Sequence, residues 1–147
     1  MAAENATRGK EINSIIAGID SISPRSVSDP VILSGDFNSG SHLDWTRDTE
    51  KMHFGYRIEW PGSVHAHQSG FLDAYRQIHP DPVKDRGITW STIKHGDDPR
   101  YQNDRIDFIY FRGKPLKALD ANVIDSGTGR FPSDHAAITA LFKVSPN

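Results

Sequence analysis

The sequence predicts an α/β fold, in which helices pack on strands that carry polar side chains at their ends. Two observations lead to this prediction. Four isoleucines near the N-terminus recur at i, i+3, i+4 and i+7, a spacing typical of an amphipathic helix that packs on a sheet (Ile12, Ile15, Ile16 and Ile19). Short runs rich in apolar, β-branched and aromatic residues follow up to the C-terminus, and such runs are typical of strands.

The first helix is expected over residues 6–19, with polar residues on its other face. A linker rich in Ser and Pro at 21–29 leads to Pro30, which opens a strand at 31–34. The continuous apolar character of this strand predicts that both of its faces are buried. The first part of the chain is therefore a helix followed by a strand.

Residues 38–69 are rich in Gly, His, Trp and charge with little periodicity, so we expect irregular structure, with a short helical turn near 43–46. A long loop beside a site is usually functional. Residues 71–78 predict a short helix that ends before Pro80. Further strands are expected at 88–93, 105–111, 122–125 and 136–144, with turns at 113–115 and 127–129.

The composition is that of an ordinary soluble protein and selects no function. The 147 residues suffice for one domain, and 36% of them are hydrophobic and 24% charged. A net charge of -2 creates no global field for nucleic acid, so a polyanion would have to be held locally or through a metal. The chain has no cysteine, which suits a reducing compartment. Because it has neither a signal core nor an apolar stretch of about 18 residues, we expect a soluble protein without a membrane span, with the cytoplasm as the favoured location.

Asp36 and Asn38, in Gly-Asp-Phe-Asn at the end of an apolar run, are the first candidate site residues. Residues two apart on a strand point the same way, and the C-terminal edge of strands is where α/β folds keep their chemistry. An Asp carboxylate can take a proton from water, while an Asn amide can donate to a developing phosphoryl charge. Taken alone, the motif also fits an ordinary turn at a strand end.

Asp107 interrupts the apolar strand expected at 105–111, and a buried carboxylate needs a cationic or donor partner. One candidate partner is Arg105, two residues away on the same strand face, in a surface ion pair on an edge strand. The other is His135, in Ser-Asp-His just before the last strand. A carboxylate bonded to one imidazole nitrogen favours the protonated ring and leaves the other nitrogen free to contact a phosphate oxygen.

Asp134 directly precedes His135, and neighbouring residues in extended geometry point to opposite sides. Asp134 is therefore free to serve as an oxygen ligand, or to orient a ligand, of Mg²⁺ or Mn²⁺, since these hard cations prefer carboxylates. Taken alone, Ser-Asp-His also fits a capped turn before a strand.

The ordered motifs Gly-Asp-Phe-Asn, Arg-Ile-Asp-Phe-Ile and Ser-Asp-His resemble those of the endonuclease/exonuclease/phosphatase superfamily, the fold class of deoxyribonuclease I. The stretches at 70–81 and 88–91 also resemble segments that these proteins carry between their catalytic motifs, so the resemblance covers about residues 8–142. It implies a four-layer α/β/β/α sandwich, an α+β sandwich of which residues 1–147 supply only the C-terminal portion.

For the chemistry, the resemblance implies a metal-dependent hydrolase of phosphate esters, either a phosphodiesterase or nuclease or a phosphatase, in which water attacks in line. Asp36 would orient or deprotonate this water, and Asn38 would stabilise the transition state. His135, oriented by Asp107, would contact the scissile phosphate, and Asp134 would help to hold Mg²⁺ or Mn²⁺.

The chain departs from the family pattern before Asp36. Family members begin with strands that carry an Asn and a metal-binding Glu, whereas Glu4 and Glu11 here lie in a polar tail and in the amphipathic helix. The sheet face that the missing half would cover is expected to be exposed and to invite a partner chain or self-association. Three explanations stay open: a fragment of a longer product, a half-domain that assembles with another chain, and an inactive homologue. The alternative to an enzyme is thus a non-catalytic binding or assembly half-domain.

The sequence leaves the substrate open among nucleic acids, lipid phosphates, and sugar or inositol phosphates. Several aromatic and arginine residues offer stacking or phosphate contacts, although such residues more often serve in packing (Trp45, Trp60, Trp90, Tyr101, Arg47, Arg57 and Arg100). Trp90 in particular is expected to pack under the site. The other histidines are interpreted as solvated loop residues and not as a zinc site, because no cysteine or placed third ligand accompanies them (His42, His53, His65, His67, His79 and His95).

Overall fold

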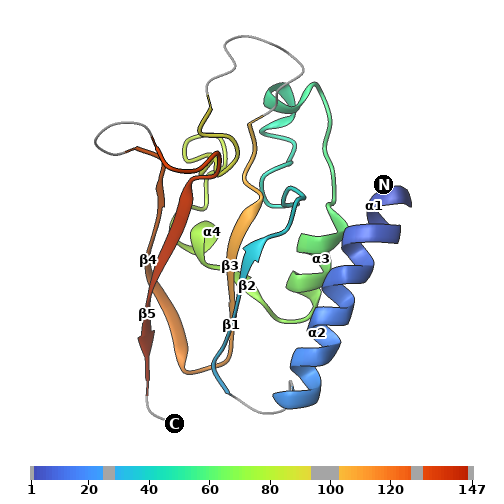
Figure 1. The fold of residues 1–147 in the computed structure, drawn as a ribbon, viewed down its shortest axis with the longest axis vertical. Coiled ribbons are helices and arrows are strands. Elements are labelled where there is room, and N and C mark those ends of the chain that lie inside the picture. The colour runs from blue at the N-terminus through green and yellow to red at the C-terminus, as the bar shows by residue number, and fades with distance from the viewer. Residues whose placement is uncertain (1, 25–28, 94–102, 127–130, 146–147) are drawn as a thin grey trace.

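The computed structural model describes residues 2–24, 29–93, 103–126 and 131–145. In these parts, N-terminal helical segments are followed by strands in two antiparallel sheets, which confirms the prediction of a mixed helix-and-strand fold (Figure 1). The helical elements are α1 (Ala2–Glu4), the π-helix η1 (Asn5–Gly9), α2 (Lys10–Ile22), the 3-10 helix η2 (Glu50–His53), α3 (Pro61–Gln68) and α4 (Ala74–Ile78). The strands are β1 (Val31–Asp36), β2 (Leu72–Asp73), β3 (Asp107–Arg112), β4 (Leu116–Ile124) and β5 (Ala137–Val144).

Strand β3 organises the core because its two faces contact different elements. It lies between β1 and β2 in a three-stranded sheet, while β4 and β5 pair with each other. Phe108 and Tyr110 of β3 pack with residues of α2 and α3, whereas Ile109 and Phe111 pack with α4, β4 and β5. Side chains alternate along a strand, so Asp107 at the start of β3 falls on the face that looks toward β4 and β5.

The isoleucine pattern correctly predicted the N-terminal helix. Ile12 and Ile16 are each 3% exposed and pack in the cluster of Phe108 and Tyr110. Helical structure extends beyond 6–19 in both directions, from Ala2 to Ile22, with a π-helical segment that ends at the buried Gly9. A Cβ at that glycine would lie 3.2 Å from the Pro61 side chain, so the absence of a side chain lets the helix approach α3 closely.

The prediction that the first strand is buried on both faces is wrong. Strand β1 lies at the edge of its sheet, Ile32 is 53% exposed, and residues from Ser34 to Asp36 are exposed. An apolar run is compatible with a central or an edge strand, and the number of neighbouring strands that decides between them is a property of the tertiary structure. The run nevertheless forms a strand, from Val31 to Asp36.

Two predicted elements differ from the structure in the middle of the chain. The helical turn expected near 43–46 is matched by a hydrogen-bonded turn at 42–44, but the segment expected to be irregular contains α3. This helix starts with Pro61, a favoured first residue, but it buries small residues and has no apolar stripe that periodicity could detect. Residues 88–93 do not form a continuous strand: only Trp90 bridges, to Asp104 and to His135.

The remaining predictions are close to the observed elements. Residues 71–78 contain the short strand β2 before α4, and the helix is shorter than predicted. The strand expected at 122–125 is the end of the longer β4, and β3 and β5 agree with their predicted positions to within two residues. The turn expected at 127–129 lies outside the described residues. None of the helices that the structure describes is long and apolar enough to cross a membrane.

A buried network of ion pairs holds the segment that leads into β3. Arg105 is 0% exposed, and its guanidinium donates to Asp44 at 2.9 Å and to Asp73 at 2.7 Å. Arg76 donates to the same Asp44, and Asp73 also caps the N-terminus of α4 by accepting from backbone N–H groups. Burial alone would lower the pKa of Arg105, but the charges of Asp44 and Asp73 raise it above its ordinary value, so the guanidinium stays charged.

Candidate active site

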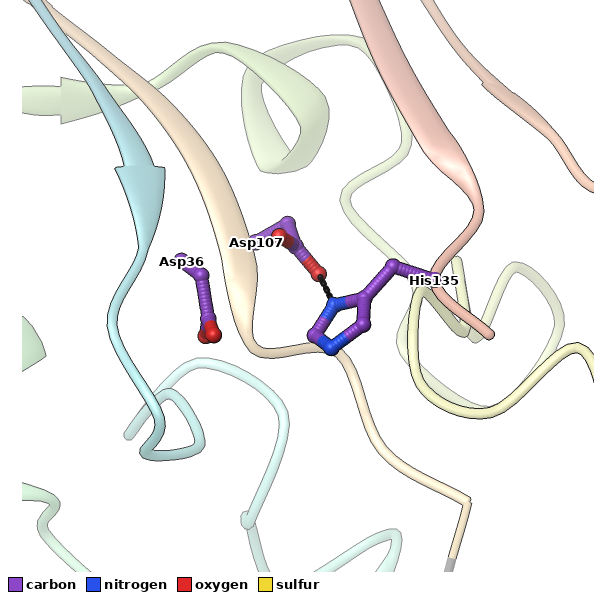
Figure 2. A group of neighbouring side chains, drawn as sticks. All are labelled: Asp36, Asp107 and His135. Carbon is purple, nitrogen blue, oxygen red and sulfur yellow. Dashed lines mark hydrogen bonds and ion pairs between the residues drawn. The ribbon is translucent and has the colours of Figure 1, made fainter. Parts of the chain in front are cut away.

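Asp36, Asp107 and His135 meet at one end of the three-stranded sheet. Asp36 is the last residue of β1, Asp107 is the first of β3, and His135 lies two residues before β5 (Figure 2). The antiparallel register makes Asp36 and Asp107 direct cross-strand partners. One ligand atom from each of the three side chains lies within 4.8 Å of the other two. Three segments that are far apart in the sequence therefore place their functional groups together.

Asp107 and His135 form the predicted pair. The Nδ1 atom of His135 lies 2.9 Å from Oδ2 of Asp107, and both side chains are partly buried. The alternative surface pair of Arg105 with Asp107 is wrong, because the Arg105 guanidinium is buried with Asp44 and Asp73. The contact agrees with the predicted pair, and the Nε2 atom of His135 stays available for another contact.

The electrostatics of this group favour a positive charge. Burial alone would lower the pKa of His135, but the hydrogen bond and charge of Asp107, with the charges of Asp36 and Asp134, raise it above its ordinary value. Two carboxylates directly opposite each other on neighbouring strands repel one another. An imidazolium or a bound cation between them relieves this repulsion.

Thr89 links the two sides of the site, and the sequence analysis did not assign it a role. Its buried Oγ1 accepts the backbone N–H groups of Ile106 and Asp107, each at 3.0 Å. Its carbonyl oxygen accepts the N–H of Ala136 at 2.7 Å. Thr89 therefore fixes the start of β3 relative to the segment that carries His135. The signal in the sequence that could have indicated this position is the Thr-Trp pair at 89–90, within a run of strand-like residues.

Asn38 lies beyond the end of β1, so strand alternation does not determine its direction. Its φ is 47°, in the left-handed region that Asn adopts more readily than most residues, and its backbone N–H donates to Oδ1 of Asp36 at 2.7 Å. The strand-end turn that the motif alone suggested is therefore present. Asn38 nevertheless lines the same cavity as His135, so the turn brings it to the site.

Asp134 stands apart from the group of three. It is exposed and lines a hollow with Thr92 and Ser133, whereas His135 lines the cavity beside Trp90. This arrangement agrees with the expectation that the neighbouring side chains serve different surfaces. Its part as a metal ligand stays a prediction, because the ligand group that the described residues form consists of Asp36, Asp107 and His135.

Two expectations about aromatic residues need correction. Trp90 does not pack beneath the site as a core residue: it is partly exposed and lines the cavity. His53 is not a solvated loop residue, because it is 4% exposed and stacks on the indole of Trp45 with ring centroids 4.1 Å apart. Burial lowers the pKa of His53, and the charge of Arg86 lowers it further. Tyr101, Arg100 and His95 lie outside the described residues.

The effect of Asp107 on the pKa of His135 can be measured by NMR titration. We expect the imidazole of His135 to titrate above about 6.5, and Asp107→Asn to lower this pKa because it removes the charge that favours the imidazolium. His42 is the internal control, since burial and then His67 lower its pKa and Asp107 does not contact it. An unchanged His135 titration in the variant would contradict the pairing.

The sign of the pH dependence of stability follows from the raised pKa of His135. Its contribution to the free energy of unfolding is fully present below the unfolded pKa of about 6.5 and is lost as the pH rises through the higher folded pKa. The difference in the free energy of unfolding between the wild-type chain and Asp107→Asn should therefore shrink as the pH rises above the folded pKa of His135. Urea unfolding at several pH values measures it.

The model of the Endonuclease/Exonuclease/phosphatase family matches residues 15–135, which is more than half of the chain. The chain belongs to this family. The matched range contains Asp36, Asn38, Asp107 and His135, although the match by itself assigns them no role.

Two individual proteins are similar to this family member. The uncharacterized protein F14F9.5 of Caenorhabditis elegans is 36% identical over an alignment of 157 positions, which covers 95% of this chain and 50% of that protein. The crystal structure of D. rerio TDP2 complexed with a single-strand DNA product matches with a TM-score of 0.57 and 23% identity, over 93% of this chain and 50% of that one. The chain therefore has the deoxyribonuclease I-like α/β fold, and it spans about half the length of both proteins.

Proposed function

We propose that this chain carries the active-site residues of a metal-dependent hydrolase of phosphate esters, most simply a phosphodiesterase. The observation that carries the proposal is the direct opposition of Asp36 and Asp107 beside the imidazole of His135. The repulsion between these two carboxylates lowers the stability of the fold, so the arrangement is better explained by a function. A bound cation would offset the repulsion and would also hold an anionic ester. Membership of the Endonuclease/Exonuclease/phosphatase family supports this class of reaction.

In this proposal each residue has a separate task. Asp107 holds the ring of His135 through Nδ1, so that Nε2 donates to an oxygen of the scissile phosphate. Asp36 orients the attacking water or takes its proton. The amide of Asn38 donates to the charge that develops on the phosphoryl oxygens.

The donor set fits a hard divalent cation. Asp36 and Asp107 offer carboxylate oxygens within 4.8 Å of each other and of an imidazole nitrogen, and Mg²⁺ and Mn²⁺ prefer oxygen ligands. We propose that Asp36 and Asp107 would hold this ion, and that Asp134, which lines a neighbouring hollow, would orient a ligand of it. When bound, the ion supplies a positive charge that offsets the charge of the phosphoryl oxygens.

The test is the hydrolysis of a generic phosphodiester and of a phosphomonoester by the purified chain, with Mg²⁺ or Mn²⁺ and with a chelator. We expect turnover that needs the metal, is faster on the diester, and falls by at least about 100-fold in Asp36→Ala. Asp36 is exposed at a strand end, so this substitution should leave the unfolding transition nearly unchanged.

Asp48→Ala is the matched control, because Asp48 is also exposed and lines a different hollow. It should leave turnover unchanged. Turnover that survives chelation, or an equal loss in both variants, would contradict the assigned roles. A folded chain without turnover on either ester would contradict hydrolysis by this chain and would favour the second function.

The second function is that of a binding or assembly half-domain without catalysis. It is favoured by apolar side chains that the described sheets leave exposed, with Ile32 at 53%, Leu119 at 49%, Leu141 at 59% and Val144 at 63%. Scattered exposed apolar residues are common, but several on strands favour a covering chain. Sedimentation of the purified chain distinguishes self-association from a monomer that needs another partner.

A further inference from the structure

A cavity of about 500 Å³ lies beside His135, and apart from His135 and Asn38 the proposed hydrolysis does not use the residues that line it. Three tryptophans, Trp45, Trp60 and Trp90, line it together with the carboxyl groups of Glu4 and Asp104. A cavity of this size falls within the range of small-molecule sites, which is roughly 300–1,000 Å³. Because His135 lies in the same lining, a group bound here can belong to the ester whose phosphate contacts that histidine.

The tryptophan wall is held in place by its own contacts. The ring of Trp45 stacks on His53 and meets Trp60 edge to face, with ring centroids 5.2 Å apart. Its Nε1 donates to Oδ2 of Asp104 at 2.7 Å. A Cβ at Gly40 would lie 2.8 Å from Nε1 of Trp60, so only glycine lets the chain pass this close to the indole. These contacts preorganise the wall before a ligand binds.

The positive charges that act on the two carboxyl groups come from outside the cavity lining: Arg86 acts on Asp104, and Arg8 acts on Glu4. Burial raises the pKa of Asp104 to about 6, although hydrogen bonds from Trp45 and from the backbone of Arg105 lower it. Oε1 of Glu4 is buried and has no hydrogen-bond partner in the described part of the chain. Of the described residues that line the cavity, none is Lys or Arg. The cavity therefore has two carboxyl groups, and among these described lining residues only His135, at the phosphate end, can carry a positive charge.

We propose that this cavity binds an organic cation, an ammonium or quaternary ammonium group, which is part of the phosphate ester that His135 contacts. A cation is attracted to the faces of indole rings and to carboxylates, while a polyanion is repelled by Glu4 and Asp104. The inference rests on the proposed function for the phosphate end of the substrate. It narrows the substrate to a zwitterionic phosphodiester whose alcohol carries the positive charge.

The test is calorimetric titration of the 147-residue chain with choline, in a buffer that contains a chelator. The matched ligand is 3,3-dimethylbutan-1-ol, which has nearly the shape of choline without its charge. We expect saturable binding of choline and at least about tenfold weaker binding of the neutral alcohol. Glu4→Gln and Asp104→Asn should each weaken choline binding several-fold, whereas Glu11→Gln, on the same helical segment but outside this cavity, should not.

Three outcomes would overturn the inference. They are equal affinity for the two ligands, no saturable binding of choline by the folded chain, and undiminished binding in both acidic variants. Displacement of choline by a short single-stranded oligonucleotide at comparable concentration would assign the wall to base stacking instead. Because the titration uses neither metal nor turnover, a failure to bind choline would leave the hydrolase proposal standing. Conversely, a chain that bound choline without hydrolysing either ester would support the cation site and contradict the hydrolase proposal.

Discussion

Arg105→Gln is expected to lower the free energy of unfolding by about 3–5 kcal/mol. The guanidinium is 0% exposed and donates to Asp44 and Asp73, which are 4% and 3% exposed. Removing one partner from a buried ion pair leaves uncompensated charge that water cannot reach. A loss of this size is a large part of the roughly 5–15 kcal/mol that stabilises a typical domain. Urea unfolding followed by circular dichroism measures it.

Arg8→Gln is the matched control, because it makes the same substitution in an ion pair on the surface. Arg8 contacts Glu11 at 2.8 Å, and the two side chains are 38% and 58% exposed to solvent, so little change is expected. Similar effects of the two substitutions would contradict the view that Arg105 acts through buried charges. A large loss with Arg105→Gln alone would show that an arginine beside a candidate catalytic strand serves the fold.

His135→Ala is expected to lower kcat/KM on a phosphodiester by about 10²–10³, the cost of losing one donor to a developing oxyanion. The reason is that Nε2 of His135 is the nitrogen left free when Nδ1 bonds to Asp107. The side chain of His135 is 28% exposed, so stability should change much less than activity. Steady-state kinetics at saturating Mg²⁺ or Mn²⁺, with urea unfolding of the same samples, measures both.

His67→Ala removes an exposed histidine of α3 and should leave kcat/KM unchanged. If the two histidine variants lost activity equally, the role of His135 in phosphate contact would be refuted. If His135→Ala lost activity only because the variant was unfolded, while His67→Ala stayed folded and active, His135 would have a structural role instead. Asp107→Asn offers an intermediate case, because it keeps the histidine but removes the charge that orients it.

Part of the candidate site could be predicted because its signals are local. A carboxylate in an apolar strand and a histidine before another strand each stand out against their neighbours, and their pairing follows from the need of a buried charge for a partner. Asp107 and His135 are indeed 2.9 Å apart. That Arg105 pairs instead with Asp44 and Asp73 required the structure, because nothing in the sequence marks these two carboxylates as its partners.

The sequence by itself determined the N-terminal helix, most of the strands and the positions of the motifs, because hydrophobic periodicity and strand-like runs are properties of neighbouring residues. Only the tertiary structure decided that β1 is an edge strand, that α3 forms within an aperiodic segment, and that Thr89 joins the two halves of the site. It also decided that Trp45 and Asp104, 59 residues apart, share a hydrogen bond. These features depend on tertiary contacts between segments that are distant in the sequence. Such contacts are determined by burial and strand register over the whole chain, and not by neighbouring residues.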